Sequence, residues 1–360
     1  MTLNRFYKLF YISLLLPACL FLFSCHYGVK SDEAILKSVP LPLLTESPIK
    51  LSVIYAINPR LPKMTPKQIN ALLSEAENVT KRHFNVDIDF EFKGEISLEE
   101  LTGSTLSPQL LSISKEMIYD FKGKEGNRDR LIKNMEEELR KKKTSLHKMI
   151  DYARPYLIKG PEKNSYAGFS AALVDTMLTR LDEWKSIKGS DGKPVIDDSF
   201  YNEYIIWDML GYGQVPYDIV LTNQLIASAE YLGQDIHSAI RGGITAGATS
   251  YNRDSPFGSY VFFTTFLYSN HYELLLKLRN NGSYGEMTAA TLAGAYLAHE
   301  IGHLLFHFGH PYGSNECVMN PVELLKFHEW YGNIDAEACQ VGSNESMKAG
   351  SISITYDPRW

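Results

Sequence analysis

The spacing of apolar residues near the start of the chain predicts a strand, a helix and a second strand. Leu51 to Ile57 is a continuous apolar run rich in β-branched residues, which is typical of a buried strand. Thr65-Pro66 reads as an N-cap followed by proline at the first helical position, and helical spacing then continues to about His83. Val86 to Phe92 alternates strictly between apolar and polar residues, as a half-buried strand does.

The remainder of the chain has a long helical part and then a mixed part. Residues 97–210 are mostly helical in pattern, and we interpret them as an insertion between residues 47–96 and residues 211–360. Met287 to Phe308 is a long helical pattern rich in alanine and leucine. Before it, strands are predicted at Tyr217–Leu221, Gly243–Tyr251 and Ser259–Phe266.

The first residues have the pattern of an export signal. A short basic start precedes the apolar run Leu9–Phe23, which is too short and wrongly flanked for a stable membrane span. The run ends in Leu22-Phe23-Ser24-Cys25, which resembles a bacterial lipoprotein signal whose cysteine becomes the acylated N-terminus. We therefore expect residues 1–24 to be a signal peptide and Cys25 to anchor the chain in a membrane through its lipid. Residues 25–46 would form a polar tether.

The expected location is the bacterial cell envelope, and the outer membrane is favoured because no aspartate follows the cysteine. The alternative is an ordinary secretory signal that is cut nearby. The chain has 36 Lys and Arg against 42 Asp and Glu, so its net charge of −6 does not suggest a nucleic-acid partner. Its 44% of hydrophobic residues argue against a disordered chain.

Two cysteines remain after export. Cys19 would leave with the signal and Cys25 would carry lipid, which leaves Cys317 and Cys339 as an even pair in an oxidising compartment. We expect them to form a disulfide. The alternative is a pair of free or metal-binding thiols.

The segment His299-Glu300-Ile301-Gly302-His303 carries the candidate chemistry, and it lies in the long helical pattern. Residues i and i+4 sit one turn apart on one helix face, so two imidazoles can reach one Zn²⁺. The glutamate falls on the adjacent edge, where it can take a proton from a metal-bound water. The segment therefore predicts one Zn²⁺ per chain, with His299 and His303 as ligands and Glu300 as the general base. The alternative is a buried helix with ordinary histidines.

Two further segments follow this helix, Gly309-His310-Pro311 and Cys317-Val318-Met319-Asn320. With the histidine motif they resemble the metzincins, zinc endopeptidases that have an extended histidine motif and a methionine turn. The Cys-Val-Met-Asn run is most similar to the archaemetzincin branch. The resemblance implies an α+β, metzincin-like zincin core, with a mixed twisted sheet and an active-site helix. It also implies that Met319 underlies the zinc site and that a third histidine completes it.

The third ligand is the point at which the sequence departs from the metzincin spacing. That spacing places a histidine at position 309, whereas this chain has Gly309 followed by His310. Gly309 can take the left-handed conformation that ends a helix, and Pro311 then favours an extended backbone at His310. We therefore predict His310 as the third ligand.

Other residues remain candidates for the third position. His307 lies eight residues past His299, about 12 Å along an unbroken helix, so it needs the helix to break earlier. Other zinc peptidases use a glutamate from a later helix, for which Glu323 and Glu329 are feasible. The structural-zinc cysteines of archaemetzincins are mostly missing here, so we expect no second zinc.

The resemblance implies a zinc-dependent endopeptidase whose partner is a peptide or protein substrate. By the same resemblance, the substrate would lie extended along an edge strand within Gly243–Tyr251. The alternatives are a zinc-stabilised surface binding lipoprotein without turnover, and a zinc amidase or esterase that acts on envelope polymers.

Overall fold

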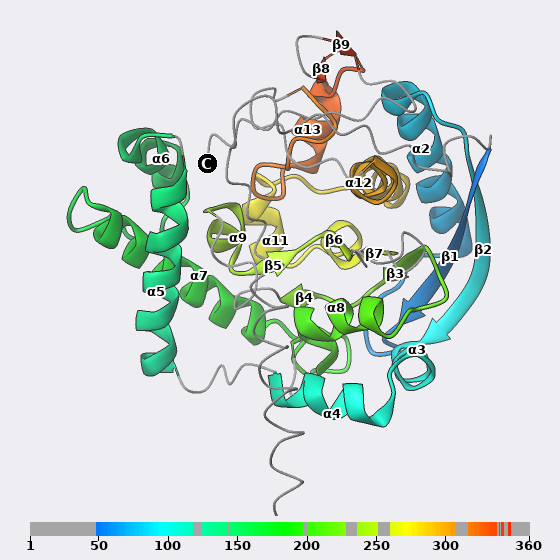
Figure 1. Ribbon diagram of the computed structural model, residues 1–360, viewed down its shortest axis with the longest axis horizontal. Helices are drawn as coiled ribbons and strands as arrows, with labels where there is room; N and C mark the ends of the chain where they lie inside the picture. Colours follow the sequence, from blue (N-terminus) through cyan, green and yellow to red (C-terminus); the bar gives the residue numbers. More distant parts are fainter. Residues whose placement is uncertain are drawn as a thin grey trace, which may run out of the picture. The chain divides into compact units, whose positions relative to one another are not determined.

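The computed structural model describes most of the chain after the predicted tether (Figure 1). The described residues fall in one compact unit, Leu36–Trp360. The predicted signal peptide 1–24, Cys25 and the tether 25–46 lie outside the described residues. Within the described part of the chain, every helix is too short or too polar to cross a membrane. The structure describes residues 48–117, 124–142, 144–196, 200–227, 236–250, 260–306, 316–336, 338, 340–341 and 345–346.

A mixed five-stranded sheet with the order β2-β1-β3-β7-β6 is the centre of the fold. Its first four strands are parallel, whereas β6 at one edge is antiparallel to β7. In register, Tyr55 of β1 faces Leu221 of β3, which in turn faces Phe263 of β7. The strands are β1 (Ile49–Ile57), β2 (Ile88–Ser97), β3 (Ile219–Thr222), β6 (Gly247–Ser250) and β7 (Tyr260–Thr264).

Two long helices cover one face of this sheet (Figure 1). Helix α2 (Pro66–Phe84) begins with a capping box between Thr65 and Gln68, as the Thr-Pro signal predicted. Helix α12 (Glu286–Phe306) packs against it so closely that a Cβ at Gly294 would meet the backbone of Leu72. The many alanines of α12 make this short separation between the helices feasible.

The opposite face of the sheet is covered by helices from both ends of the predicted insertion. Ile54 and Phe262 point to this face, where they pack against Leu101, Trp207 and other apolar residues. The helices there are α3 (Leu98–Thr105), α4 (Pro108–Met117) and α8 (Tyr204–Tyr212) (Figure 1). The ends of the segment 97–210 are therefore a layer of the core around the sheet. The domain bounds stay a prediction.

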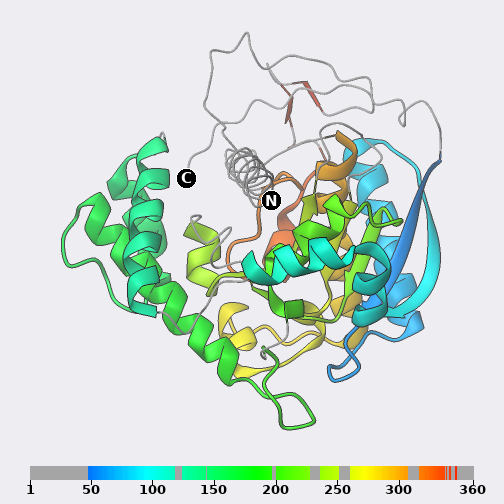
Figure 2. The same cartoon turned by 60° about the horizontal axis from the view of Figure 1, so that its bottom comes forward.

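The middle of the segment 97–210 forms a group of helices on the side away from β1 and β2 (Figure 2). These are α5 (Lys124–Lys141), α6 (Leu146–Ala153) and α7 (Tyr166–Ser186), and α7 packs on α9 (Ile236–Arg241). Their apolar residues, among them Met135, Met149 and Leu173, belong to the same buried cluster as the α2–α12 layer.

Short elements complete the fold. The helices are α10 (Phe266–Ser269), α11 (Glu273–Leu278) and α13 (Phe327–Asn333), with 3₁₀ turns at Arg154–Tyr156 and Phe200–Asn202. The small strand pairs are β4 (Ile226–Ala227) with β5 (Ile244–Thr245), and β8 (Gln340–Val341) with β9 (Glu345–Ser346).

Two predicted strands differ from those observed. The single strand predicted over Gly243–Tyr251 is divided, because β5 pairs with β4 whereas β6 pairs with β7 in the main sheet. The strand predicted over Val86–Phe92 lies later, at Ile88–Ser97. Asn85 ends α2 in the left-handed conformation, and pairing with β1 continues as far as Ser97.

Candidate metal centre

The last two turns of α12 carry the histidine motif into the interior. His299 is 1% exposed and Glu300 is 3% exposed, while His303 is only half-buried. The helix continues to Phe306, so His299 and His303 lie one turn apart on an unbroken helix face, as their spacing predicted. The motif is therefore enclosed on its inner side and more open at His303.

The two imidazoles are oriented toward one point. Their Nε2 atoms are 3.1 Å apart, and the rings are nearly perpendicular at 88°. A tetrahedral Zn²⁺ with Zn–N bonds of about 2.0–2.1 Å would separate two nitrogen ligands by about 3.3–3.4 Å. The observed separation is close to this value, so His299 and His303 fit a shared Zn²⁺.

The other ring nitrogen of His299 is held by the segment that contains Met319. Nδ1–H donates to the carbonyl of Val318 at 2.8 Å, which leaves the lone pair on Nε2 for a metal. Burial is the main cause that lowers the pKa of His299 well below its usual value. The neighbouring His303 lowers it further, so the ring is neutral.

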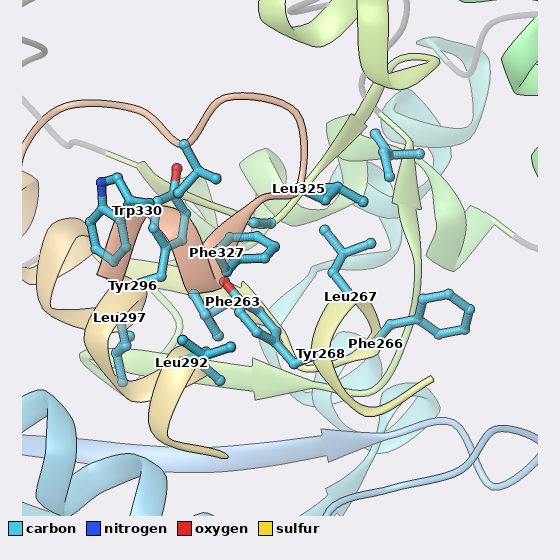
Figure 3. Close-up of a cluster of buried hydrophobic side chains, with 14 of the residues drawn as sticks. Phe263, Phe266, Leu267, Tyr268, Leu292, Tyr296, Leu297, Leu325, Phe327 and Trp330 are labelled. Atoms are coloured by element: carbon cyan, nitrogen blue, oxygen red, sulfur yellow. The ribbon is translucent and has the colours of Figure 1, made fainter. Parts of the chain in front are cut away.

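An aromatic group fixes the plane of the His299 ring. Tyr296 stacks on it with centroids 4.7 Å apart and planes 12° apart. Phe327 and Trp330 each meet Tyr296 edge-on at 5.3 Å, and Figure 3 shows Tyr296 beside both of them. This cluster joins α12 to α13 and restricts rotation of the histidine.

Met319 packs directly against the helix between Glu300 and His303. It is fully buried, and a Cβ placed on Gly302 would lie 3.1 Å from the Met319 Cε atom. Glycine is therefore needed at this place in the motif, because it lets the methionine approach the helix backbone.

The edge strand β6 lies along the Glu300 carboxylate. The Thr249 hydroxyl is 3.2 Å from the Glu300 carbonyl and 3.4 Å from Oε2, and it donates to these oxygens. Two residues earlier, a Cβ at Gly247 would lie 3.1 Å from Oε1. Burial raises the pKa of Glu300 to about 8, and the hydrogen bond from Thr249 opposes that rise.

The predicted third ligand His310 and its rival His307 lie outside the described residues. Within the described residues, no group of three His, Cys, Asp or Glu side chains is placed to hold a metal. The Glu323 carboxylate is engaged elsewhere, since it accepts hydrogen bonds from the Tyr156 hydroxyl and, at 3.0 Å, from Lys326 Nζ. His310 as the third ligand stays a prediction.

Comparisons with known proteins add one distant likeness. No model of a protein family matches the sequence, and no curated protein matches it. A solved structure of a zinc-dependent peptidase from Methanocorpusculum labreanum (strain Z) is similar at a TM-score of 0.31 and 13% identity. The match covers 80% of this chain and 95% of that chain. The TM-score and the sequence identity are both too low to assign a function.

Of the cysteines in the predictions, the structure describes Cys317. Cys317 is buried and disulfide-bonded. Cys339, the partner that we expect, lies outside the described residues, as does Cys25. The pairing of Cys317 with Cys339 and the lipidation of Cys25 therefore stay predictions.

Sequence reasoning missed one residue of the same helix and two residues from distant segments that contact or lie near the site. Thr249 and Tyr296 both contact the histidine motif, and Arg241 lies close enough to affect the pKa of His299. Tyr296 had a usable signal, because it lies one turn before His299 on the predicted helix. Thr249 had none, since the sequence does not define which face of its strand meets α12.

Proposed function

We propose that this chain is a zinc-dependent endopeptidase of the bacterial cell envelope, with a metzincin-like core. The observation that carries the proposal is the 3.1 Å separation of the His299 and His303 Nε2 atoms on a helix that also places Glu300 in the interior. Without a metal the pair can share one Nε2–H···Nε2 hydrogen bond at this distance, and zinc binding would replace that bond with two Zn–N bonds.

The residues of the chain have distinct roles in the proposed reaction. Zinc bound by His299, His303 and His310 would polarise the scissile carbonyl and lower the pKa of a water molecule. Glu300 takes the proton of the attacking water and gives it to the leaving amine. A nearby cation lowers the pKa of a carboxyl group, so the raised pKa of Glu300 does not exclude the role of base.

The sheet edge supplies a place for the substrate. Strand β6 is the end strand in the order of the five-stranded sheet, and among the described residues it pairs with β7 on one edge and with no strand on the other. An added strand could pair with that second edge. Gly247 and Thr249 on β6 already border the Glu300 carboxylate. A peptide bound along β6 would therefore pass next to the proposed base.

The deciding experiment measures zinc content and peptide cleavage together. The purified chain should bind one zinc and cleave a peptide library in a chelator-sensitive manner. Glu300→Gln should keep the zinc and lose at least about a hundredfold in kcat, the usual contribution of a general acid–base group. Glu323→Gln is the control and should keep full activity.

Each alternative function gives a different result in this experiment. Zinc without turnover of any peptide would support a binding lipoprotein. Hydrolysis of amides or esters of envelope polymers, with intact peptides, would support an amidase or esterase. Unimpaired peptide hydrolysis by Glu300→Gln would refute the proposed mechanism.

The third ligand is tested by zinc affinity in three single variants. His310→Ala should lose tight zinc binding, whereas His307→Ala and Glu323→Ala should keep it. Circular dichroism spectra of each variant control for folding. A His310→Ala chain that binds zinc as tightly as the parent would overturn the assignment.

The anchor is tested separately in cells. We propose that Cys25 carries lipid, so Cys25→Ala should move the protein from the membrane fraction to the aqueous fraction. If the variant stays with the membranes, the lipoprotein proposal is wrong, and the proposal of peptidase activity is unaffected.

A further inference from the structure

A buried arginine lies beside the segment that follows Met319. Arg241 is the last residue of α9 and is 8% exposed. Its carbonyl accepts a hydrogen bond from Trp184 Nε1 at 2.9 Å. Gly242 follows at a φ of +83°, so close that a Cβ there would lie 2.7 Å from the Arg180 Cβ atom. The backbone at Arg241 is therefore fixed by tight packing.

The guanidinium of Arg241 and the ring of His299 are tied to one short segment. Arg241 Nη2 donates to the Val322 carbonyl at 3.1 Å, and His299 Nδ1 donates to the Val318 carbonyl at 2.8 Å. The segment Val318–Val322, which contains Met319, therefore bonds both the guanidinium and the ring of the proposed metal ligand.

The charge of Arg241 has no anionic partner among the described residues. The Val322 carbonyl is the acceptor of its one side-chain hydrogen bond there, and its enclosed Nε has no hydrogen-bond partner. A buried charge is normally paired, because removing it from water without compensation is costly. A ligand that carries a negative charge would supply the missing partner.

Arg279 is a useful contrast. It is 3% exposed and donates to the carbonyls of Asn270, at 2.9 Å, and Leu267. Its guanidinium also covers the Tyr284 ring at 4.7 Å. Its Nε, like that of Arg241, has no hydrogen-bond partner among the described residues, but its guanidinium contacts three groups of the fold, whereas that of Arg241 bonds one carbonyl. Arg279 therefore provides a matched structural control.

We propose that Arg241 is a specificity-determining residue that binds a carboxylate of the substrate held at the metal centre. The proposal rests on the proposed function, because the substrate class is taken to be a peptide. A planar guanidinium matches a carboxylate with two parallel hydrogen bonds. The carboxylate has two sources in a peptide, an Asp or Glu side chain and the free C-terminus.

The test is peptide binding to the zinc-loaded Glu300→Gln chain, in which turnover does not interfere. Labelled hexapeptide amides carry one aspartate at each position in turn, and a matched set carries asparagine. A further neutral peptide is made with a free C-terminal carboxylate and as its amide. Fluorescence anisotropy measures each dissociation constant for the Glu300→Gln chain, which is the parent here. The same constants are measured after Arg241→Met, Arg241→Lys or Arg279→Met is added to that chain.

We expect one charged peptide to bind about tenfold more tightly than its neutral match, the usual effect of a charged hydrogen bond. That preference should disappear in Arg241→Met, fall in Arg241→Lys and persist in Arg279→Met. Tighter binding of an aspartate peptide than of its asparagine match identifies an acidic side chain as the ligand. Tighter binding of the peptide with a free C-terminus than of its amide identifies the C-terminal carboxylate. Equal or undetectable binding of charged and neutral peptides by the parent overturns the proposal, even if the variants fail to fold. A preference that survives in Arg241→Met overturns it as well.

Failure of this proposal and failure of the proposed function are distinguishable. Chelator-sensitive cleavage by the wild-type chain without any carboxylate preference would refute only the role of Arg241. A preference that depends on Arg241 in a chain that cleaves no peptide would refute the peptidase and keep the carboxylate site.

Discussion

Replacing Gly302 with alanine tests how closely Met319 must approach the metal-binding helix. A Cβ at this position would lie 2.9 Å from Phe84 Cζ and 3.1 Å from Met319 Cε, and closer still to the Met319 sulfur. These atoms are at the ends of side chains, but both side chains are buried and Phe84 also packs on Phe306. The added methyl group must therefore displace packed neighbours.

Two opposing terms set the size of the effect. Replacing glycine by alanine inside a helix favours folding by about 0.5–1 kcal/mol. Forcing an extra methyl group into a packed core costs about 1–3 kcal/mol. We therefore expect Gly302→Ala to lower the free energy of unfolding by up to about 2.5 kcal/mol. Zinc affinity should fall too, because a shift of Met319 disturbs the Val318 carbonyl that orients His299.

Denaturant unfolding and zinc titration measure both effects, and Gly103→Ala is the matched control. Gly103 lies in helix α3, where an added Cβ would have no atom within 4 Å, so its replacement should raise the free energy of unfolding by about 0.5–1 kcal/mol. If Gly302→Ala is stabilised as much as the control and keeps the parental zinc affinity, the packing argument for Met319 is wrong.

Three further predictions concern other residues. Thr249→Val should lower kcat by about tenfold with little change in KM, because the Glu300 carboxylate loses one hydrogen bond. Thr249→Ser should restore kcat, and parental kinetics in Thr249→Val would refute the positioning role. Burial raises the pKa of Glu203 to about 8, so the stability that its protonated form contributes is fully present below about pH 4.5 and is lost as the pH rises through 8. Glu203→Gln should therefore gain stability relative to the parent by up to about 1.4 kcal/mol per pH unit in that window, and a pH-independent difference in unfolding free energy would contradict this. Non-reducing peptide mapping should join Cys317 to Cys339, a link expected to stabilise the fold by about 3 kcal/mol; a different partner for Cys317 would refute the pairing.

Local periodicity was enough to predict the elements that carry the site. The strand at Ile49–Ile57 and the helix at Pro66–Phe84 follow from apolar spacing and from the Thr-Pro start signal. The helix that contains His299 was predicted within a few residues of its observed bounds, and its one-turn spacing brought the two imidazoles together. These features depend on residues that are neighbours in the sequence.

The features that sequence reasoning missed depend on pairing between distant segments. The predicted strand Gly243–Tyr251 divides because Ile244 and Thr245 pair with β4, whereas Gly247 begins the pairing with β7. Nothing in the local pattern identifies either partner strand. The same limit applies to the helices of 97–210, whose amphipathic patterns predicted helices without indicating which of them cover the sheet.

The protonation state of His299 illustrates how distant segments complete a motif that is local in sequence. An exposed histidine has a pKa of about 6.5 and is a poor metal ligand when it is charged. Here Tyr296 covers the ring, Val318 accepts its Nδ1 proton, and burial lowers its pKa. The carbonyl comes from the segment of Met319, and Gly302 gives that segment its close approach. The motif defines the spacing of the nitrogen atoms, while the segment after the helix keeps one of them unprotonated and correctly oriented for zinc.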